Sequence, residues 1–97
     1  MAGVTEAQLQ AAVIELAQTF KWRVYHTHDS RRSQAGFPDL VMVRRRVLIF
    51  AELKSEKGRL RPEQAEWLDA LTNTRATEVY IWRPSDWLSG EIEKVLR

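Results

Sequence analysis

Two acidic residues and a lysine stand where the sequence predicts neighbouring strands. Asp39 lies at the start of one apolar stretch, and Glu52 and Lys54 end the next. If these strands form a hairpin closed symmetrically over Arg45-Arg46, paired residues have numbers that add up to 91, and Asp39 lies opposite Glu52. Cross-strand neighbours have Cβ atoms about 4.5–5.5 Å apart. A three-residue loop would shift this register by one, and Arg-Arg is a poor pair for a primed turn.

Carboxylates in that arrangement favour a bound cation. Two negative charges at ~5 Å repel by roughly 3 kcal/mol at an effective dielectric near 20, and a divalent ion reverses the sign. Lys54 projects from the same strand face as Glu52, where its ammonium group can orient a water or hold a phosphate oxygen. The alternative is a surface salt bridge between Glu52 and Lys54, which fits poorly with a run as apolar as Val47–Ala51. The three residues therefore indicate metal-assisted chemistry on a phosphate.

The elements that must position these residues follow from periodicity and turn signals. Strands are predicted at 22–27, 38–43, 47–54 and 77–82. Helices are predicted from the cap Thr5 to about Phe20, from Pro62 to about Thr74, and after the cap Ser85. The last helix would bury Leu88, Ile92 and Val95. The resulting order, αβββαβα, predicts an α/β fold with a mixed sheet flanked by helices.

The first helix has a complete start signal. Thr5 and Gln8 form a capping box, and Val4 and Leu9 form the matching hydrophobic staple. The helix would then bury a stripe made of Leu9, Val13, Leu16 and Phe20.

Two polar residues on the predicted helices point inward. Glu6 lies seven residues before Val13 and so faces the buried stripe of the first helix. Gln64 shares a face of the second helix with the apolar Trp67 and Leu68. The alternative for Gln64 is a buried amide satisfied by backbone groups, at about even odds.

Basic residues gather in three loops. The chain has 11 arginines and four lysines with a net charge of +2. The clusters are Arg31 with Arg32, then Arg44, Arg45 and Arg46, then Lys57, Arg59 and Arg61. Each cluster alone is typical of a solvated surface, but three together favour a polyanionic partner. His28, at the start of the first basic loop, is a weaker candidate for a substrate contact.

Several short motifs occur in an order that resembles a known nuclease family. Gly36-Phe37-Pro38-Asp39 is followed by Glu52-Leu53-Lys54 and then by Lys57-Gly58-Arg59-Leu60-Arg61-Pro62-Glu63-Gln64. This order resembles the VRR-NUC branch of the PD-(D/E)XK nucleases, over nearly the whole chain. Pro-Asp and Glu-x-Lys are weak signals alone, but with the flanking motifs they become strong. The tight arginine-rich turn departs from the glycine-bearing loop expected of the family.

The resemblance implies a restriction-endonuclease-like core and a role for each matching residue. It implies a metal site formed by Asp39, Glu52, the Leu53 carbonyl and Glu6. It implies Asp39, Glu52, Lys54 and Gln64 as catalytic residues, and Mg²⁺ or Mn²⁺ as the ion. The three basic clusters are then candidates for DNA binding.

The activity implied is hydrolysis of phosphodiester bonds in DNA. Stand-alone domains of this kind resemble Holliday junction resolvases, so branched DNA is the expected substrate. Two cuts are needed to resolve a junction, which predicts a homodimer. The alternatives are a DNA-binding module with a vestigial site, a non-catalytic subunit of a larger complex, and a sequence-specific restriction enzyme. The last would normally need more chain for reading bases.

The length and composition of the chain limit which of these functions are possible. A chain of 97 residues is enough for one domain, here predicted as a single VRR-NUC-like domain over 1–97. It has no cysteine, which excludes disulfides and thiolate chemistry. No signal peptide or membrane-spanning run is recognisable, and no small-molecule cofactor is expected. We therefore expect a cytoplasmic protein, and the resemblance implies a bacterial or phage origin.

Overall fold

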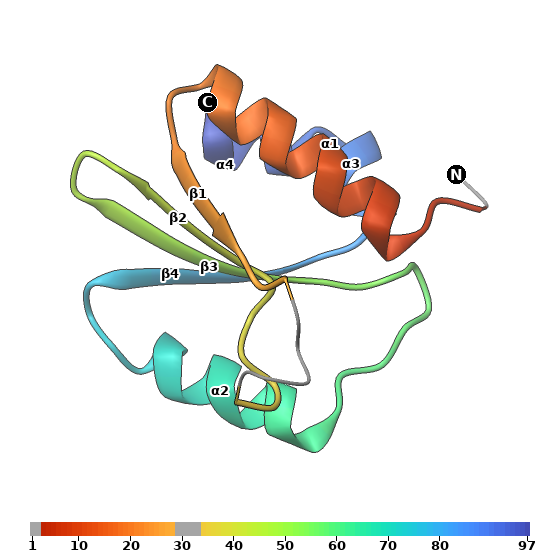
Figure 1. The fold of residues 1–97 in the computed structure, drawn as a ribbon, viewed down its shortest axis with the longest axis vertical. Coiled ribbons are helices and arrows are strands. Elements are labelled where there is room, and N and C mark those ends of the chain that lie inside the picture. Colours follow the sequence, from red (N-terminus) through yellow and green to blue (C-terminus); the bar gives the residue numbers. More distant parts are fainter. Residues whose placement is uncertain (1–2, 29–33) are drawn as a thin grey trace.

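Eight helices and strands make up the part of the chain that the structure, a computed structural model, describes: residues 3–28 and 34–97. In chain order they are α1 (Glu6–Thr19), β1 (Arg23–His26), β2 (Leu40–Arg44), β3 (Val47–Leu53), α2 (Pro62–Thr72), β4 (Thr77–Trp82), α3 (Pro84–Leu88) and α4 (Glu91–Leu96). Helices α1, α3 and α4 cover one face of a twisted sheet, and α2 lies on the other (Figure 1). None of the helices within the two described ranges is long and apolar enough to cross a membrane.

The sheet is mixed, as predicted, with the strand order β1-β2-β3-β4. The first two pairings are antiparallel and the pairing of β3 with β4 is parallel. Leu40 pairs with Ala51 and Arg44 pairs with Val47, so the predicted register is confirmed and the three-residue loop is wrong. Arg45 completes the two-residue turn with φ at 55°.

The core fills the space between the sheet and the helices of the α1 face. Leu9 and Val13 of α1 pack there with the central-strand residues Met42 and Ile49, and all four are buried. The Trp22 indole also lies in this core and donates a hydrogen bond from Nε1 to the Leu96 carbonyl at 2.8 Å. This bond ties the end of the chain to the start of β1.

Helix α1 begins as predicted and ends in a Schellman motif. Thr5 caps it through the full capping box with Gln8. At the other end the Trp22 N–H donates to the Ala17 carbonyl at 3.0 Å and the Lys21 N–H to the Gln18 carbonyl at 3.0 Å. Lys21 occupies the left-handed position of this motif with φ at 73°. Ala17 completes the fully buried stripe, whereas the predicted Leu16 and Phe20 are only half-buried.

The end of the chain differs from the prediction. One helix capped by Ser85 was expected, but two short helices form, and the N-cap of α3 is Arg83, with Pro84 in the first turn. Gly90, with φ at 83°, separates α3 from α4 because a left-handed residue cannot continue a helix. As a result Leu88 is 55 % exposed, so its predicted burial is wrong, whereas Ile92 is buried.

Candidate active site

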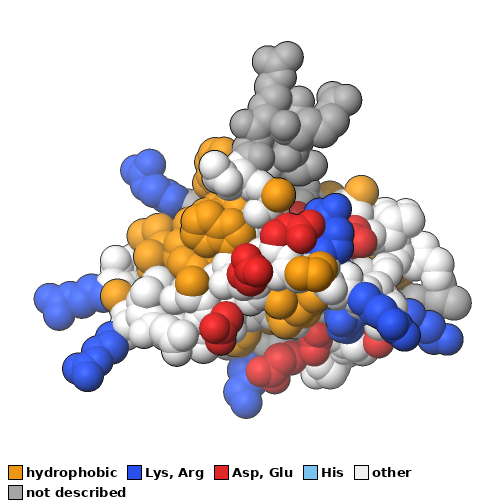
Figure 2. Space-filling model, turned by 90° about the horizontal axis from the view of Figure 1, so that it is seen from below, with side chains coloured by type: hydrophobic (Ala, Val, Ile, Leu, Met, Phe, Trp, Pro, Cys, Tyr) orange, Lys and Arg blue, Asp and Glu red, His pale blue; other side chains and the backbone are white. Residues whose placement is uncertain are grey.

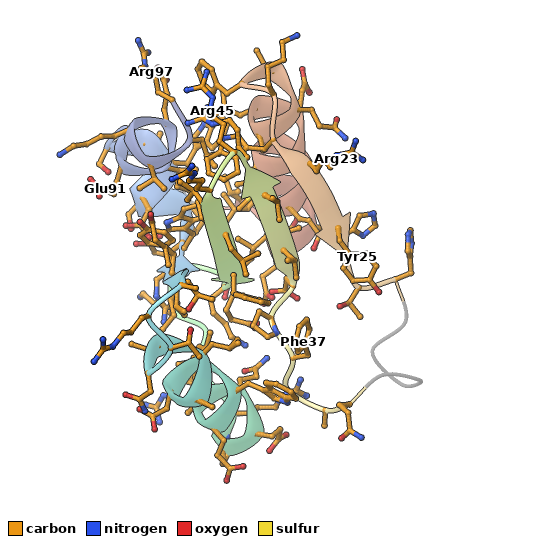
Figure 3. The ribbon with its side chains drawn as sticks, turned by 90° about the vertical axis from the view of Figure 1, so that its left-hand side faces the viewer. Arg23, Tyr25, Phe37, Arg45, Glu91 and Arg97 are labelled. Atoms are coloured by element: carbon orange, nitrogen blue, oxygen red, sulfur yellow. The ribbon has the colours of Figure 1, made fainter. Side chains whose placement is uncertain are left out.

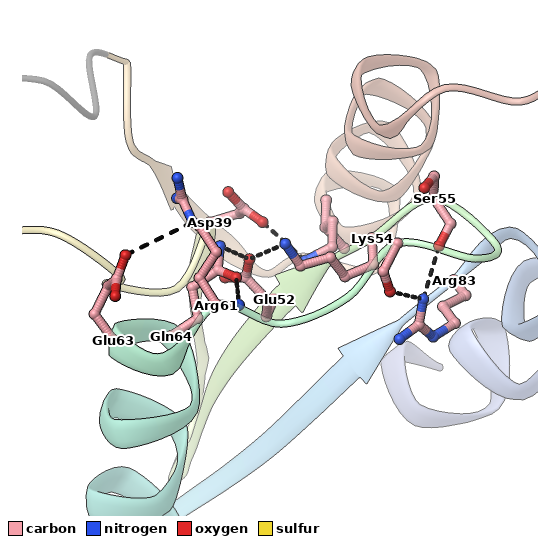
Figure 4. Close-up of polar contacts among 10 residues, drawn as sticks. Asp39, Glu52, Lys54, Ser55, Arg61, Glu63, Gln64 and Arg83 are labelled. Carbon is pink, nitrogen blue, oxygen red and sulfur yellow. Dashed lines mark hydrogen bonds and ion pairs between the residues drawn. The ribbon is translucent and has the colours of Figure 1, made fainter.

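A cleft of about 480 Å³ lies where β3 ends, and it collects most of the candidate site residues. It is lined by Glu6, Thr27, His28, Gln34, Gly36, Phe37, Asp39, Glu52, Lys54, Arg59, Arg61 and Gln64. Figure 4 shows the central polar contacts between β3 and the start of α2. Residues from four separate parts of the sequence therefore meet in one place.

Asp39 stands directly before β2 and links the two strand ends. Its Oδ2 accepts a hydrogen bond from the Leu53 N–H at 2.8 Å. Its own carbonyl accepts one from the Thr27 N–H at 3.2 Å. Burial raises the pKa of the Asp39 carboxyl above its ordinary value, and the Leu53 N–H opposes that rise. Asp39 is thus held rigidly with its carboxyl turned toward the next strand.

Glu52 is the most buried acidic residue of the cleft, at 2 % exposure. Its Oε2 accepts a hydrogen bond from Gln64 Nε2 at 2.9 Å and lies 3.8 Å from Lys54 Nζ. Among the described residues its Oε1 is buried without any hydrogen-bond partner. Burial, followed by the negative charge of Asp39, raises the pKa of Glu52 to about 8. An unpartnered acidic oxygen of this kind is a candidate ligand for a cation.

Lys54 is also buried, with 8 % of its surface exposed. The pair it forms with Glu52 is therefore interior, and the surface salt bridge considered from the sequence is wrong. One lysine faces the buried carboxyl of Glu52 and the half-buried carboxyl of Asp39, and its charge lowers the pKa of both, though burial outweighs it.

Gln64 is aimed inward, as its place on the predicted helix face indicated. Its Oε1 accepts a hydrogen bond from the Arg61 N–H at 2.8 Å while its Nε2 holds Glu52. The amide is thus satisfied by backbone at one end only. At the other end, Nε2 of Gln64 links the start of α2 to Glu52 of β3.

Gly36 explains why the segment before Asp39 needs a glycine. Its φ is 87°, and a Cβ built there would lie 2.5 Å from the carbonyl carbon and oxygen of Glu63. Any side chain would therefore force the start of α2 away from the cleft.

Arg83 is a residue of this region that the sequence did not reveal. Its Nη1 donates to the Ser55 carbonyl at 2.8 Å and the Gly58 carbonyl at 2.7 Å, and more weakly to Glu56 at 3.3 Å (Figure 4). It thereby fixes the turn that follows Lys54. The only signal was its place directly after the strand 77–82, which does not name its partners.

The predicted DNA-binding residues fall in different places. Arg59 and Arg61 line the cleft, whereas Lys57 lines a separate hollow beside Ser85. Arg44 and Arg45 lie at the opposite end of the sheet with Arg46, at the β2–β3 turn. Arg31 and Arg32 are outside the described residues. DNA contact by all of these residues stays a prediction.

The Arg44 side chain forms hydrogen bonds within the fold. Its Nη1 donates to the Phe20 and Leu96 carbonyls at 3.0 Å each, and its guanidinium lies 4.5 Å from the centre of the Trp22 ring. These contacts hold β2 to the ends of α1 and α4.

The acidic residues fit a divalent cation. In the part of the chain that the structure describes, no three acidic or histidine side chains form a complete cage. Mg²⁺ is commonly bound by one or two carboxylates, with water and substrate phosphate filling the other positions. Asp39 and Glu52 supply such a pair, and Oε1 of Glu52, which has no hydrogen-bond partner among the described residues, is an oxygen of the type that binds this ion. Glu6 faces the same cleft, and its charge raises the pKa of both carboxyl groups.

The fold and the site together define a nuclease-type α/β domain. The family model for the VRR-NUC domain matches residues 3–83, and the chain belongs to this family. No curated protein gives a significant match.

Solved structures with the same fold include two VRR-NUC domain proteins. The first is 19 % identical with a TM-score of 0.72, covering 99 % of this chain and 93 % of the other. The second is 19 % identical with a TM-score of 0.71, covering 96 % of each chain. A Holliday junction resolvase of Archaeoglobus fulgidus, Hjc, is 20 % identical with a TM-score of 0.54, covering 77 % of this chain and 64 % of the other. The chain thus shares its fold with known nuclease-family proteins.

Proposed function

We propose that this protein is a divalent-metal-dependent endonuclease that hydrolyses phosphodiester bonds in DNA. The observation that carries the proposal is the buried Glu52 carboxyl with its unpartnered oxygen, in one cleft with Asp39 and Lys54. Burying acidic groups costs stability unless a counter-charge is bound. A cation together with a DNA phosphate provides charges of the right sign for this set. Membership of the VRR-NUC family supports the same reaction class.

The residues of the cleft have different roles in this reaction. Asp39 and Glu52 hold Mg²⁺ or Mn²⁺, assisted by the Leu53 carbonyl and by the charge of Glu6. When bound, such an ion polarises the scissile phosphate and lowers the pKa of a water. Lys54 offsets the negative charge that builds on the phosphate oxygens as water attacks phosphorus. The bond to the 3′ oxygen breaks, which leaves a 5′-phosphate and a 3′-hydroxyl end.

Gln64 is a positioning residue in this scheme. Its Nε2 restrains one oxygen of Glu52, while the other has no hydrogen-bond partner among the described residues. Arg59 and Arg61, which line the cleft, bind phosphates that flank the cut.

Branched DNA, such as a Holliday junction, is the substrate we infer. The fold shared with Hjc supports this choice, as does the need for two symmetric cuts that a homodimer would meet. Among the described residues, α2 packs against β4 and leaves Tyr25 of β1 at 60 % exposure, which offers a surface for such a contact.

Cleavage of a DNA panel tests the proposal. Duplex, flap, fork and four-way junction would be incubated with the wild type in Mg²⁺ or Mn²⁺, beside Lys54→Ala and Asp39→Asn. Asparagine keeps an oxygen to accept the Leu53 N–H, so it removes charge without removing that bond. We expect cutting of branched substrates, a loss of about 100-fold or more in Lys54→Ala, and retained binding without cutting in Asp39→Asn.

The opposite results would indicate a non-catalytic module. A wild type that binds the panel without cutting, and that takes up no Mn²⁺ in calorimetry, overturns the enzyme and leaves a DNA-binding or interaction role. Arg75→Ala, an exposed substitution outside the cleft, is the control for charge loss alone.

A further inference from the structure

A second hollow lies at the end of the sheet opposite the candidate active site. It measures about 520 Å³, and five of its seven lining residues are basic: Lys21, Arg23, Arg44, Arg45 and Arg97. Figure 3 shows Arg23, Arg45 and Arg97 near this end, with Phe37 of the catalytic cleft toward the other. We name this feature the distal basic hollow.

Backbone strain marks the distal basic hollow as more than a solvated surface. In the described residues, the non-glycine residues with positive φ are Lys21, at 73°, and Arg45, at 55°. Both line this hollow, although they come from different elements. The left-handed conformation costs roughly 1–2 kcal/mol for a residue with a Cβ, and glycine is the favoured residue at a Schellman position and in a hairpin turn. A basic side chain thus occupies, at two positions of this hollow, a backbone conformation that favours glycine.

The charges of the hollow are largely uncompensated. Arg44 uses its donors on backbone carbonyls and forms a fixed basic floor. Arg97 pairs with Glu93. With partners drawn from the described residues, neither Lys21, Arg23 nor Arg45 forms an ion pair, and all three are exposed. Their positive potentials add, which attracts an anion to this end of the molecule.

We propose that the distal basic hollow binds a backbone phosphate of the DNA, remote from the bond that is cut. The identity of the polymer rests on the proposed function. Asp39 and Arg44 are five residues apart along β2, which at about 3.3 Å per residue places the hollow roughly 16 Å from the catalytic cleft. Nucleotides rise about 3.4 Å each along one strand of a duplex. For a duplex whose axis follows β2, the phosphate bound there lies about five nucleotides from the cut.

A charge-matched pair of variants tests the proposal by binding alone. Fluorescent four-way junction would be titrated in EDTA, from 50 to 200 mM NaCl, with the wild type, Arg23→Ala/Arg45→Ala and Arg75→Ala/Lys94→Ala. The last variant loses the same charge from exposed residues outside the hollow. We expect the first variant to bind about tenfold more weakly and the slope of log K against log[salt] to fall by about 1–2, since each phosphate contact contributes about 0.9. The control should stay within twofold of the wild type.

Neutral methylphosphonates then locate the contact. Placed one at a time along each strand, they should weaken wild-type binding several-fold about five nucleotides from the cut and leave Arg23→Ala/Arg45→Ala unaffected. The proposal is overturned if both double variants show the same affinity and salt slope, or if the neutral position affects them equally. Cleavage by the wild type is scored separately, so a failed nuclease assignment and a failed distal contact give different results.

Discussion

Glu52 places an acidic group where water cannot solvate its charge, so its protonation should control the stability of the metal-free protein. Its pKa is about 8 in the fold, against an ordinary value of 4.5. A raised carboxyl pKa contributes stability that is complete below pH 4.5 and is lost as pH rises through 8. We expect metal-free wild type to lose on the order of 2 kcal/mol of unfolding free energy between pH 5 and 9, measured by urea denaturation in EDTA.

The matched variant for this measurement is Glu52→Gln. Glutamine keeps an oxygen for the Gln64 amide and carries no charge, so its stability should vary much less over the same pH range. Added Mn²⁺ should restore the wild type at pH 8 and leave the variant unchanged. If the free energy of unfolding changed with pH equally in both proteins, the charge of Glu52 would not destabilise the fold.

Local sequence signals predicted some residues of the candidate site and not others. Asp39 and Glu52 could be paired from the sequence because their register depends only on a turn of two residues. Gln64 could be aimed inward from helical spacing alone. Arg44 could not be interpreted, because it binds the Phe20 and Leu96 carbonyls, which are remote in sequence.

The C-terminal end of α1 contains a residue with a strained backbone, and a substitution can relieve this strain. Lys21 holds the left-handed position of a Schellman motif with φ at 73°. Lys21→Gly should raise the free energy of unfolding by about 1 kcal/mol, because glycine adopts this conformation without a Cβ clash. Chemical denaturation would measure the gain, and Lys21→Ala serves as control since alanine keeps the Cβ. Equal stability of the two variants would rule out strain at this position.

The turn after β3 depends on one guanidinium. Nη1 of Arg83 donates to the carbonyls of Ser55, Glu56 and Gly58. Arg83→Ala removes all three bonds and should therefore destabilise the protein by about 1–3 kcal/mol. It should also lower the cleavage rate more than DNA affinity, because the turn begins one residue after Lys54. Rates and affinities that fall together would instead indicate that Arg83 binds DNA.

Element boundaries followed from the sequence wherever a local signal set them. The capping box of α1 and the strand Thr77–Trp82 were predicted at the observed positions. The break between α3 and α4 was missed because the apolar spacing of Leu88, Ile92 and Val95 suits one continuous helix. Gly90 alone interrupts it, and a glycine within a helical pattern is often tolerated.

On the sheet face opposite α1, the described residues cover the β4 side more than the β1 side. Tyr25 is 60 % exposed and Val43 41 % exposed on the β1–β2 half, whereas α2 packs against β4. Figure 2 shows hydrophobic side chains gathered on this side of the molecule, seen from below. A two-fold axis through this exposed half would bring the surface around Tyr25 of one copy against the same surface of the other.

This arrangement predicts that Tyr25→Ser weakens a homodimer. Loss of an aromatic anchor from the centre of a contact costs about 2 kcal/mol or more, so the dimer dissociation constant measured by analytical ultracentrifugation should rise by at least tenfold. Leu88→Ser, on the helical side and similarly exposed at 55 %, should leave it unchanged. Because one protomer holds one cleft, the weakened dimer should nick a junction singly where the intact dimer cuts it twice. A wild type that is monomeric at micromolar concentration, or a dimer broken only by Leu88→Ser, would place this sheet face outside any contact between copies.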